Sequence, residues 1–386
     1  AKVVEEYFDY RVVDNVRPSV HTESLAELQR ELSAAYVQLK LASLPGYRKL
    51  REWCAAPIAS TLEALGTTWR FIARRNNLSQ GVLGVDVGGA TTCIGAAYGD
   101  SYQWTVGANL GTGFGIRESL RLSGVSNMHR WLVAPLEEQD TWSHLENLAL
   151  RPHGIPQTMD DLLMTHAVIR QAILLTMRRM RRHHWHRLDT EPEKITTPAF
   201  DLIAARGGAL TNTPQDGLIV LSLLDALQPT GLSRLVLDWA SLWPQLGIIA
   251  RVSPLAASQV LERDSFRELG TIIAPIGEAR DGEHALNIII RREDGQTLGG
   301  DIPAGEIRRF PLALHEHAEI EVRPSRAFDI GLGRKGYGGR ARVRGGTLGI
   351  IVDTRGRPLS LPQTPSLRRE HLRRWLSSLI EDAQET

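Results

Sequence analysis

A glycine-rich turn between two apolar stretches carries the residues of this sequence best suited to phosphate chemistry. Residues 81–100, GVLGVDVGGATTCIGAAYGD, alternate apolar positions on both sides of the turn, which predicts a β-hairpin centred on Gly88–Thr91. Main-chain amides can converge on phosphate oxygens there, because Gly88 and Gly89 have no side chain to block the approach. Turn chemistry alone favours an ordinary core hairpin, because Gly-Gly hairpins are common.

The polar residues around this turn add to the case for a phosphate loop. Asp86 ends the first predicted strand, where its carboxylate can hold the water shell of a magnesium ion. Ala90 continues the turn, and Thr91 and Thr92 offer hydroxyl donors.

A second loop of the same kind follows a later predicted strand. In IAARGGALTN, Gly207 and Gly208 end an apolar run and precede a helix, so the sugar or base of a nucleotide could lie against their backbone. A tightly packed helix entry explains the same residues. Two such loops within one segment leave a nucleotide site and two tightly packed bends about equally open.

Composition excludes several classes of protein. The 386 residues carry a formal net charge of +1, which gives the chain no overall attraction to nucleic acid. The only cysteines, Cys54 and Cys93, form no metal-binding spacing or disulfide framework, which fits a reducing compartment. The N-terminus has acidic residues where a signal peptide needs basic ones, and no window resembles a membrane span. We therefore expect a cytoplasmic protein.

Helical periodicity dominates residues 1–80 and returns in the middle of the chain. Apolar residues at three- and four-residue steps predict one helix ending near Pro45 and another over Thr61–Arg75, both expected to pack in the core rather than bind a partner; the first stripe is Leu25, Leu28, Leu32, Tyr36 and Leu39. A longer helix begins at Thr158, and His166 on its apolar face is expected to be a hydrogen-bonded structural residue.

A basic cluster, RRMRRHHWHR, follows that helix at residues 178–187. Arginines around an aromatic residue could grip RNA or single-stranded DNA. A solvated helix end, with cations near the negative pole of the helix dipole, explains the cluster better, because no second nucleic-acid signature accompanies it.

These patterns predict an α/β protein with four segments. Residues 1–80 form a helical N-terminal segment, and residues 81–265 alternate strands and helices. Residues 266–364 contain short β-branched runs separated by Asp-Gly, Gly-Gly and Pro turns, typical of an all-β barrel or sandwich domain. Residues 365–386 form a C-terminal helix.

Several motifs in order resemble the glutamate mutase accessory family called GlmL or MutL, which is unrelated to the mismatch-repair protein of that name. The motifs are VDVGGATT, NLGTGFGIRESL, ARGGALTNTP, LLDALQPTGLSRLVLD, LWPQLG and RVRGGTLGIIVDTRGRPL, and the likeness runs from about Trp53 to Leu361.

The resemblance implies a fold and a set of ligands. The family belongs to the actin, sugar kinase and Hsp70 ATPase superfamily, whose two ribonuclease-H-like halves enclose ATP and magnesium. Residues 81–265 would be one such half. Asp86, Gly88, Gly89, Ala90, Thr91 and Thr92 would form its second phosphate hairpin, with Asp86 toward the metal, and Gly207 and Gly208 would form its adenosine loop. The implied role is an accessory, reactivating chaperone for an adenosylcobalamin-dependent mutase.

Two departures from the family pattern limit the expected activity. Nothing before Gly81 resembles the first phosphate hairpin of the superfamily, and Cys93 stands where the second hairpin usually has an acid. Loss of such an acid typically costs several powers of ten in phosphoryl transfer. We therefore expect a degenerate ATPase that turns over little or nothing alone. It would work with mutase subunits or with a separate ATPase half. The alternative is a noncatalytic scaffold that assembles into homo-oligomers through some of its nine tryptophans.

Overall fold

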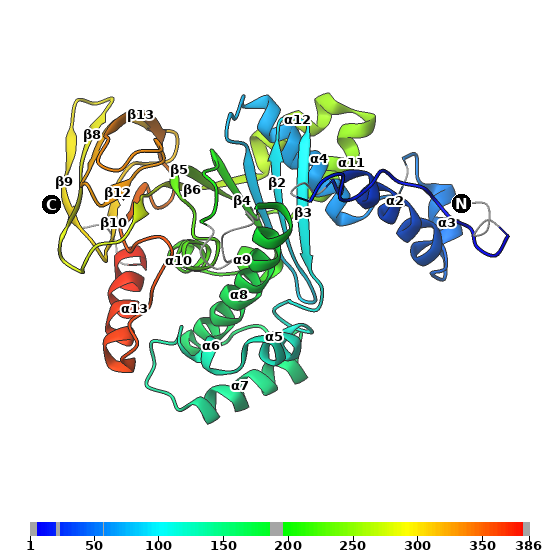
Figure 1. Ribbon diagram of the computed structural model, residues 1–386, viewed down its shortest axis with the longest axis horizontal. Helices are drawn as coiled ribbons and strands as arrows, with labels where there is room; N and C mark the ends of the chain where they lie inside the picture. Colours follow the sequence, from blue (N-terminus) through cyan, green and yellow to red (C-terminus); the bar gives the residue numbers. More distant parts are fainter. Residues whose placement is uncertain (1–5, 21–23, 57, 186–195, 381–386) are drawn as a thin grey trace.

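A long sheet runs through the middle of the molecule, and helices cover both of its faces (Figure 1). The computed structural model describes residues 6–20, 24–56, 58–185 and 196–380. The sheet has eight strands in the order β10-β14-β6-β5-β4-β1-β2-β3. Their bounds are β1 Val82–Val87, β2 Thr92–Tyr98, β3 Ser101–Gly107, β4 Leu202–Arg206, β5 Gly231–Asp238, β6 Phe266–Ala274, β10 Ile307–Phe310 and β14 Ile350–Asp353. The mixed α/β class predicted from the sequence is confirmed.

Strand direction brings the ends of three strands together. β1, β4 and β5 are adjacent and parallel, whereas β2 runs antiparallel to both of its neighbours, β1 and β3. The predicted hairpin is confirmed, because β1 and β2 pair from Val82↔Ala97 to Val87↔Thr92 around the Gly88–Thr91 turn. The carboxyl ends of β1, β4 and β5 therefore lie at one edge of the sheet, beside this turn.

One face of the sheet packs against α8 (Met159–Met180) and α10 (Asp216–Leu227). Thr158 and Asp161 form the predicted capping box at the start of α8. His166 is fully buried, with its Nδ1 2.7 Å from Ser222 Oγ and its Nε2 3.0 Å from Thr213 Oγ1. The structural role predicted for this histidine is confirmed.

The other face packs against α4 (Thr61–Arg75) and α11 (Trp243–Val252). Trp69 of α4 is completely buried over Gly84 of β1 and Gly95 of β2. A methyl group added at either glycine would overlap the indole ring, so this close approach of helix to sheet requires both glycines. The core position predicted for the Thr61–Arg75 helix is confirmed.

Shorter helices complete this part of the molecule. They are α5 (Ile116–Ser123), α6 (Ser126–His129), α7 (Glu138–Leu150), α9 (Gly208–Thr211) and α12 (Pro254–Asp264), with a π-helix, η2, at Arg181–Trp185. No helix among the described residues is both long enough and apolar enough to span a bilayer.

The β-rich character predicted for residues 266–364 is confirmed, but its strands do not all stay apart from the preceding segment. β6, β10 and β14 extend the large sheet, and the pairing of β5 with β6 crosses the domain boundary predicted at residue 265. That boundary stays a prediction. A second sheet packs against these strands through a shared apolar cluster. It has the order β13-β11-β8-β9, with β8 His284–Arg292, β9 Thr297–Pro303, β11 His317–Pro324 and β13 Gly339–Arg344. β7 (Ile276–Gly277) and β12 (Phe328–Asp329) form a two-stranded pair.

A buried ionic network ties this C-terminal region to the core. Arg355 Nη1 donates to Asp225 of α10 at 2.7 Å, and Arg355 Nε donates to Asp353 of β14 at 2.9 Å. Arg170 of α8 also donates to Asp225, and Arg357 also donates to Asp353. Burial alone would raise the pKa of Asp353, but Arg355 and Arg357 outweigh it and hold that pKa far below its usual range. The C-terminal helix α13 (Pro365–Ile380) closes this region, with Trp375 against Arg355.

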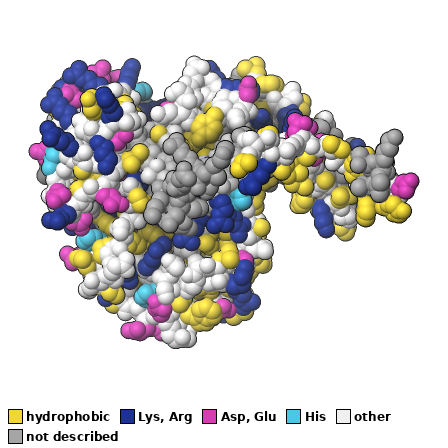
Figure 2. All heavy atoms as spheres, viewed as in Figure 1, with side chains coloured by type: hydrophobic (Ala, Val, Ile, Leu, Met, Phe, Trp, Pro, Cys, Tyr) yellow, Lys and Arg dark blue, Asp and Glu magenta, His cyan; other side chains and the backbone are white. Residues whose placement is uncertain are grey.

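The N-terminal helices extend away from the sheet and correct one prediction. α2 (Ala26–Tyr36), a π-helix η1 (Val37–Leu41) and α3 (Tyr47–Trp53) project to one side, and Figure 2 shows many apolar side chains on the face of this projection that it presents. The first apolar stripe was predicted to pack in the core, yet Leu32 is 58%, Tyr36 51% and Leu39 71% exposed. Periodicity identified an apolar face, but no described part of the chain covers it.

Candidate functional site

Three charged residues meet where the parallel strands end. Asp86 is the second-last residue of β1, Arg206 ends β4 and Asp238 ends β5. Arg206 Nη1 donates a hydrogen bond to Asp86 Oδ2 at 2.9 Å, and Arg206 Nε donates to Asp238 Oδ2 at 3.3 Å. One guanidinium group therefore bridges carboxylates from two different strands, as its forked geometry allows.

The two carboxylates have different surroundings. The Asp238 side chain is fully buried and accepts hydrogen bonds from the backbone N–H groups of Leu242, at 2.8 Å, and Trp243, at 3.0 Å, where α11 begins. The Asp86 side chain is 14% exposed, and within the described ranges its hydrogen-bond partner is Arg206. Asp238 is thus fixed by the helix start, whereas Asp86 depends on Arg206.

Burial governs the protonation of these groups. Burial raises the pKa of Asp86, an effect that the Arg206 guanidinium opposes and the Asp238 carboxylate reinforces. Burial also raises the pKa of Asp238, against the effect of the two α11 amides and Arg206. Each carboxylate therefore costs free energy to keep ionised, and the shared guanidinium lowers that cost.

Cys93 lies directly across from Asp86 in the hairpin. Burial, with a smaller contribution from the Asp86 carboxylate, raises the pKa of the Cys93 thiol to about 12. The thiol is neutral at physiological pH, so it adds neither a negative charge nor a base at this edge.

Backbone hydrogen bonds, within the turn and from residues 112–113, hold the glycine turn in place. The Gly88 N–H donates to the Thr91 carbonyl at 2.9 Å, and the Gly88 and Gly89 carbonyls accept from Thr112 and Gly113 at 3.1 and 2.9 Å. The Gly88 amide is therefore already used within the turn, while Gly89, Ala90 and Thr91 are exposed. Thr92 is fully buried, and its Oγ1 has no hydrogen-bond partner in the described part of the chain.

The second glycine loop lies against the first. Gly207 adopts a φ of +119°, and a side chain there would overlap the Val87 carbonyl oxygen at the end of β1. Gly208 is exposed and begins α9. The two predicted bends therefore meet at one edge of the sheet, as the sequence suggested. Their opening into a common nucleotide cavity stays a prediction.

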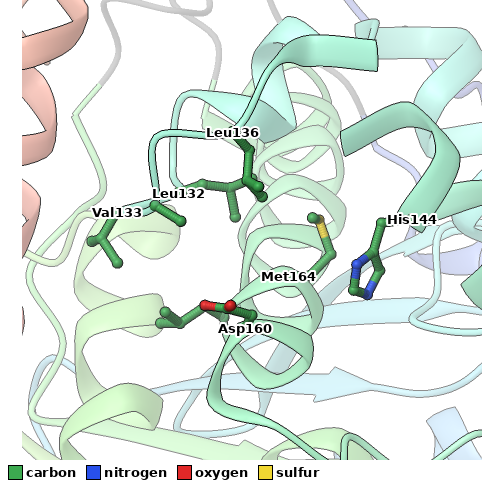
Figure 3. Close-up of a pocket in the computed structure, with 8 residues that line it drawn as sticks. Leu132, Val133, Leu136, His144, Asp160 and Met164 are labelled. Atoms are coloured by element: carbon green, nitrogen blue, oxygen red, sulfur yellow. The ribbon is translucent and has the colours of Figure 1, made fainter. Parts of the chain in front are cut away.

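Two cavities away from this edge differ greatly in size. The pocket drawn in Figure 3, between Leu132, Val133 and Met164, has a volume of about 20 Å³, room for about one water molecule. A cavity of about 540 Å³ lies between α2 and β3, lined in part by Arg30, Arg70 and Trp104. None of the predicted glycines lines either cavity.

The basic cluster is partly built into the fold. Arg181 is buried and donates to Thr197 Oγ1 at 3.2 Å, which corrects the prediction of a wholly solvated helix end. Arg182 and His183 are exposed, as that prediction requires. His186 and Arg187 lie outside the described residues.

Sequence reasoning missed Arg206 and Asp238. Each is the charged residue that ends an apolar strand, in LIAAR and LVLD, and that pattern was the available signal. Only the parallel register of β1, β4 and β5 shows that both residues lie beside Asp86.

A family model described as MutL protein matches residues 1–265. The chain belongs to the MutL protein family. This agrees with the resemblance seen in its motifs. No curated protein is significantly similar to this MutL-family chain in sequence.

Solved structures give only distant likenesses to this MutL protein. The activator of the 2-hydroxyisocaproyl-CoA dehydratase from Clostridium difficile, solved with bound ADPNP, is 13% identical over 62% of this chain and 85% of that chain, with a TM-score of 0.27. Component A of the (R)-2-hydroxyglutaryl-CoA dehydratase from Acidaminococcus fermentans is 11% identical over 62% of this chain and 88% of that chain, with a TM-score of 0.30. At these scores, neither likeness carries an argument about fold or function.

Proposed function

We propose that this MutL-family protein is a nucleotide-responsive accessory protein, and specifically a reactivating chaperone for an adenosylcobalamin-dependent mutase. Family membership over residues 1–265 supports the accessory role. The contact of Gly207 with the end of β1 carries the nucleotide part, because it brings two close-approach bends to the carboxyl ends of parallel strands. That edge is where open α/β sheets commonly bind ligands.

The strand order supports a fold of the actin-type ATPase class. In the series β3-β2-β1-β4-β5, β2 alone runs against the others, the arrangement expected of one ribonuclease-H-like half. Residues 81–265 would be that half. A second half would complete the nucleotide site, because nucleotide in this superfamily is held between two halves.

The exposed part of the edge suggests how ATP would sit. Gly89, Ala90 and Thr91 would face the phosphates, and Gly207 and Gly208 would lie against the adenosine. Asp86 would contribute to a hydrated magnesium ion. We expect binding with little or no turnover by this chain alone, since the Cys93 thiol is neutral and Asp86 is already paired with Arg206.

Isothermal titration calorimetry with ATP and Mg²⁺ tests the nucleotide part. Gly208 is exposed, and a Cβ there would make only an ordinary contact with Asn212 Nδ2 at 3.9 Å, so Gly208→Asp should fold while its carboxylate repels phosphate. Gly208→Asn is the control of nearly equal size without charge. We expect binding by the wild type and by Gly208→Asn, and loss in Gly208→Asp. No heat from the wild type at millimolar nucleotide would contradict the proposal.

The accessory role needs a separate assay. Inactivated mutase holoenzyme, incubated with this protein and ATP, should recover activity faster than with Gly208→Asp in its place. Equal recovery with both proteins would show that the chaperone activity does not depend on nucleotide binding at Gly208.

The exposed N-terminal helices favour a second candidate function, a noncatalytic assembly protein. Tyr36 and Leu39 present an apolar face that no described residue covers. Light scattering would then show oligomers with or without ATP, reduced by Leu39→Ser. Leu314→Ser is the matched control, because Leu314 is exposed in the C-terminal region. A monomer at all concentrations would exclude this function.

A further inference from the structure

We propose that Arg206 is the resident cation of this edge and keeps divalent metal ions off Asp86 until it is displaced. The inference rests on the proposed function for the location of the site, and adds a regulatory role for a residue that the family motifs did not single out. It predicts that anion binding comes first and metal binding second.

The geometry places the guanidinium where a bridging cation would lie. Its Nη1 is 2.9 Å from Asp86 Oδ2 and its Nε is 3.3 Å from Asp238 Oδ2, so one positive charge is already shared between the two carboxylates. Without Arg206, the carboxylates that β1 and β5 place on either side of β4 would both lose their ion-pair partner. Mg²⁺ binds in proteins through one or two carboxylates plus waters and phosphate oxygens, which is what Asp86 and a nucleotide could supply once Arg206 has moved.

Asp238, the other carboxylate at this edge, is fully buried and accepts hydrogen bonds from the backbone of α11. No group of three or more His, Cys, Asp or Glu side chains among the described residues could hold a metal ion. The neutral Cys93 thiol opposite Asp86 adds no negative charge. A metal at this edge therefore depends on Asp86, the carboxylate that Arg206 occupies.

Exposure distinguishes this pair from a purely structural ion pair. Arg355 and its carboxylate partners are completely enclosed, so no ion can reach them. The Arg206 side chain is 13% exposed, beside the exposed Gly208 and the Gly89–Thr91 turn. A phosphate group arriving at those bends would meet Arg206, whose guanidinium binds phosphate as well as carboxylate. Such a phosphate would draw the guanidinium from Asp86 and free that carboxylate for the metal.

Mn²⁺ binding to the full chain without nucleotide tests the inference independently of the proposed function. The free Mn²⁺ signal in electron paramagnetic resonance would be followed for the wild type, Arg206→Gln, Asp86→Asn and the double variant. We expect no Asp86-dependent binding in the wild type. Arg206→Gln should bind one Mn²⁺ at least about tenfold more tightly, because a fixed positive charge has gone, and the double variant should lose that site.

Two controls test whether the loss of any arginine on the sheet, or a misfolded variant, would give the same result. Arg234→Gln removes the nearer partner of Glu268 on the same sheet, at 2.5 Å, leaves Arg344 at 3.8 Å, and should create no Mn²⁺ site. Arg206→Met, which keeps the apolar stem, replaces Arg206→Gln if the latter does not fold, with circular dichroism as the check. Asp86-dependent Mn²⁺ binding by the wild type would overturn the inference, as would folded Arg206 variants that bind no more Mn²⁺ than the wild type. Neither result decides whether the wild type binds ATP, which calorimetry measures separately, so the two proposals fail separately.

Discussion

Neutral, buried His166 should make the stability of this protein fall as the pH drops below about 6.5. Thr213 Oγ1 donates its proton to the Ala209 carbonyl at 2.7 Å, so it accepts from the Nε2–H of His166. Nδ1 then accepts from the Ser222 hydroxyl. Burial, with a smaller effect of Arg170, lowers the pKa of His166 to about 3.

The sign and size follow from proton linkage. The unfolded chain binds a proton at His166 below a pKa of about 6.5, whereas the folded protein does not until about pH 3. The stability from this residue is therefore complete above pH 6.5 and is lost as the pH falls, by about 1.4 kcal/mol per pH unit. Between pH 6.5 and 4.5 the loss is about 2.3 kcal/mol, because the unfolded histidine is already half protonated at pH 6.5.

Urea unfolding at a series of pH values measures this slope. His166→Gln should be less stable than the wild type at neutral pH but should lose this part of the pH dependence. His183→Gln is the control, because His183 is exposed on the segment that follows α8 and its change should leave the slope unaltered. If His166→Gln and the wild type lose stability equally between pH 6.5 and 4.5, the neutral, buried state assigned to His166 is wrong.

Three further predictions concern other parts of the fold. Gly207→Ala should destabilise the protein by about 2 kcal/mol or more, because of its positive φ and the overlap with β1, whereas Gly208→Ala should change stability by less than about 0.5 kcal/mol in urea melts. Arg355→Met leaves two buried carboxylates without their shared partner and should cost about 3–5 kcal/mol in the same measurement; a change under 1 kcal/mol would refute the ionic network's role. A thiol reagent at pH 8 should modify the exposed Cys54 quickly and Cys93 only on unfolding, since the pKa of the Cys93 thiol is about 12; two fast thiols would contradict its burial.

Local patterns predicted the elements that local chemistry determines. The Gly88–Thr91 hairpin follows from two glycines between alternating strands, and α8 starts at the capping box that Thr158 and Asp161 encode. His166 was correctly expected to be structural, because it lies within an apolar helical stripe. In each case the residues that decide the structure are neighbours in the sequence.

Long-range pairing explains what the sequence did not reveal. Arg206 and Asp86 are 120 residues apart, and nothing near either residue announces the contact. β14 pairs directly with β6, although all four strands of the second sheet lie between them in the sequence. A region that looked like a separate domain therefore extends the large sheet. The core position predicted for the first apolar stripe was wrong for a related reason. Periodicity shows that Leu39 lies on an apolar face, but only the surrounding chain decides whether anything covers that face.

The charges at the sheet edge explain how the Gly88–Thr91 hairpin is stable with a thiol at position 93. An acid at position 93, which the family resemblance leads one to expect, would place a third carboxylate beside Asp86 and Asp238, with Arg206 as the one cation among the groups described here. The repulsion would then favour a bound metal. With the neutral Cys93 thiol, one guanidinium serves two carboxylates, and Asp238 is further satisfied by the α11 amides. Cys93 and Arg206 therefore act in the same direction. Together they reduce the need of this edge for a metal ion while leaving the glycine bends open to an anion.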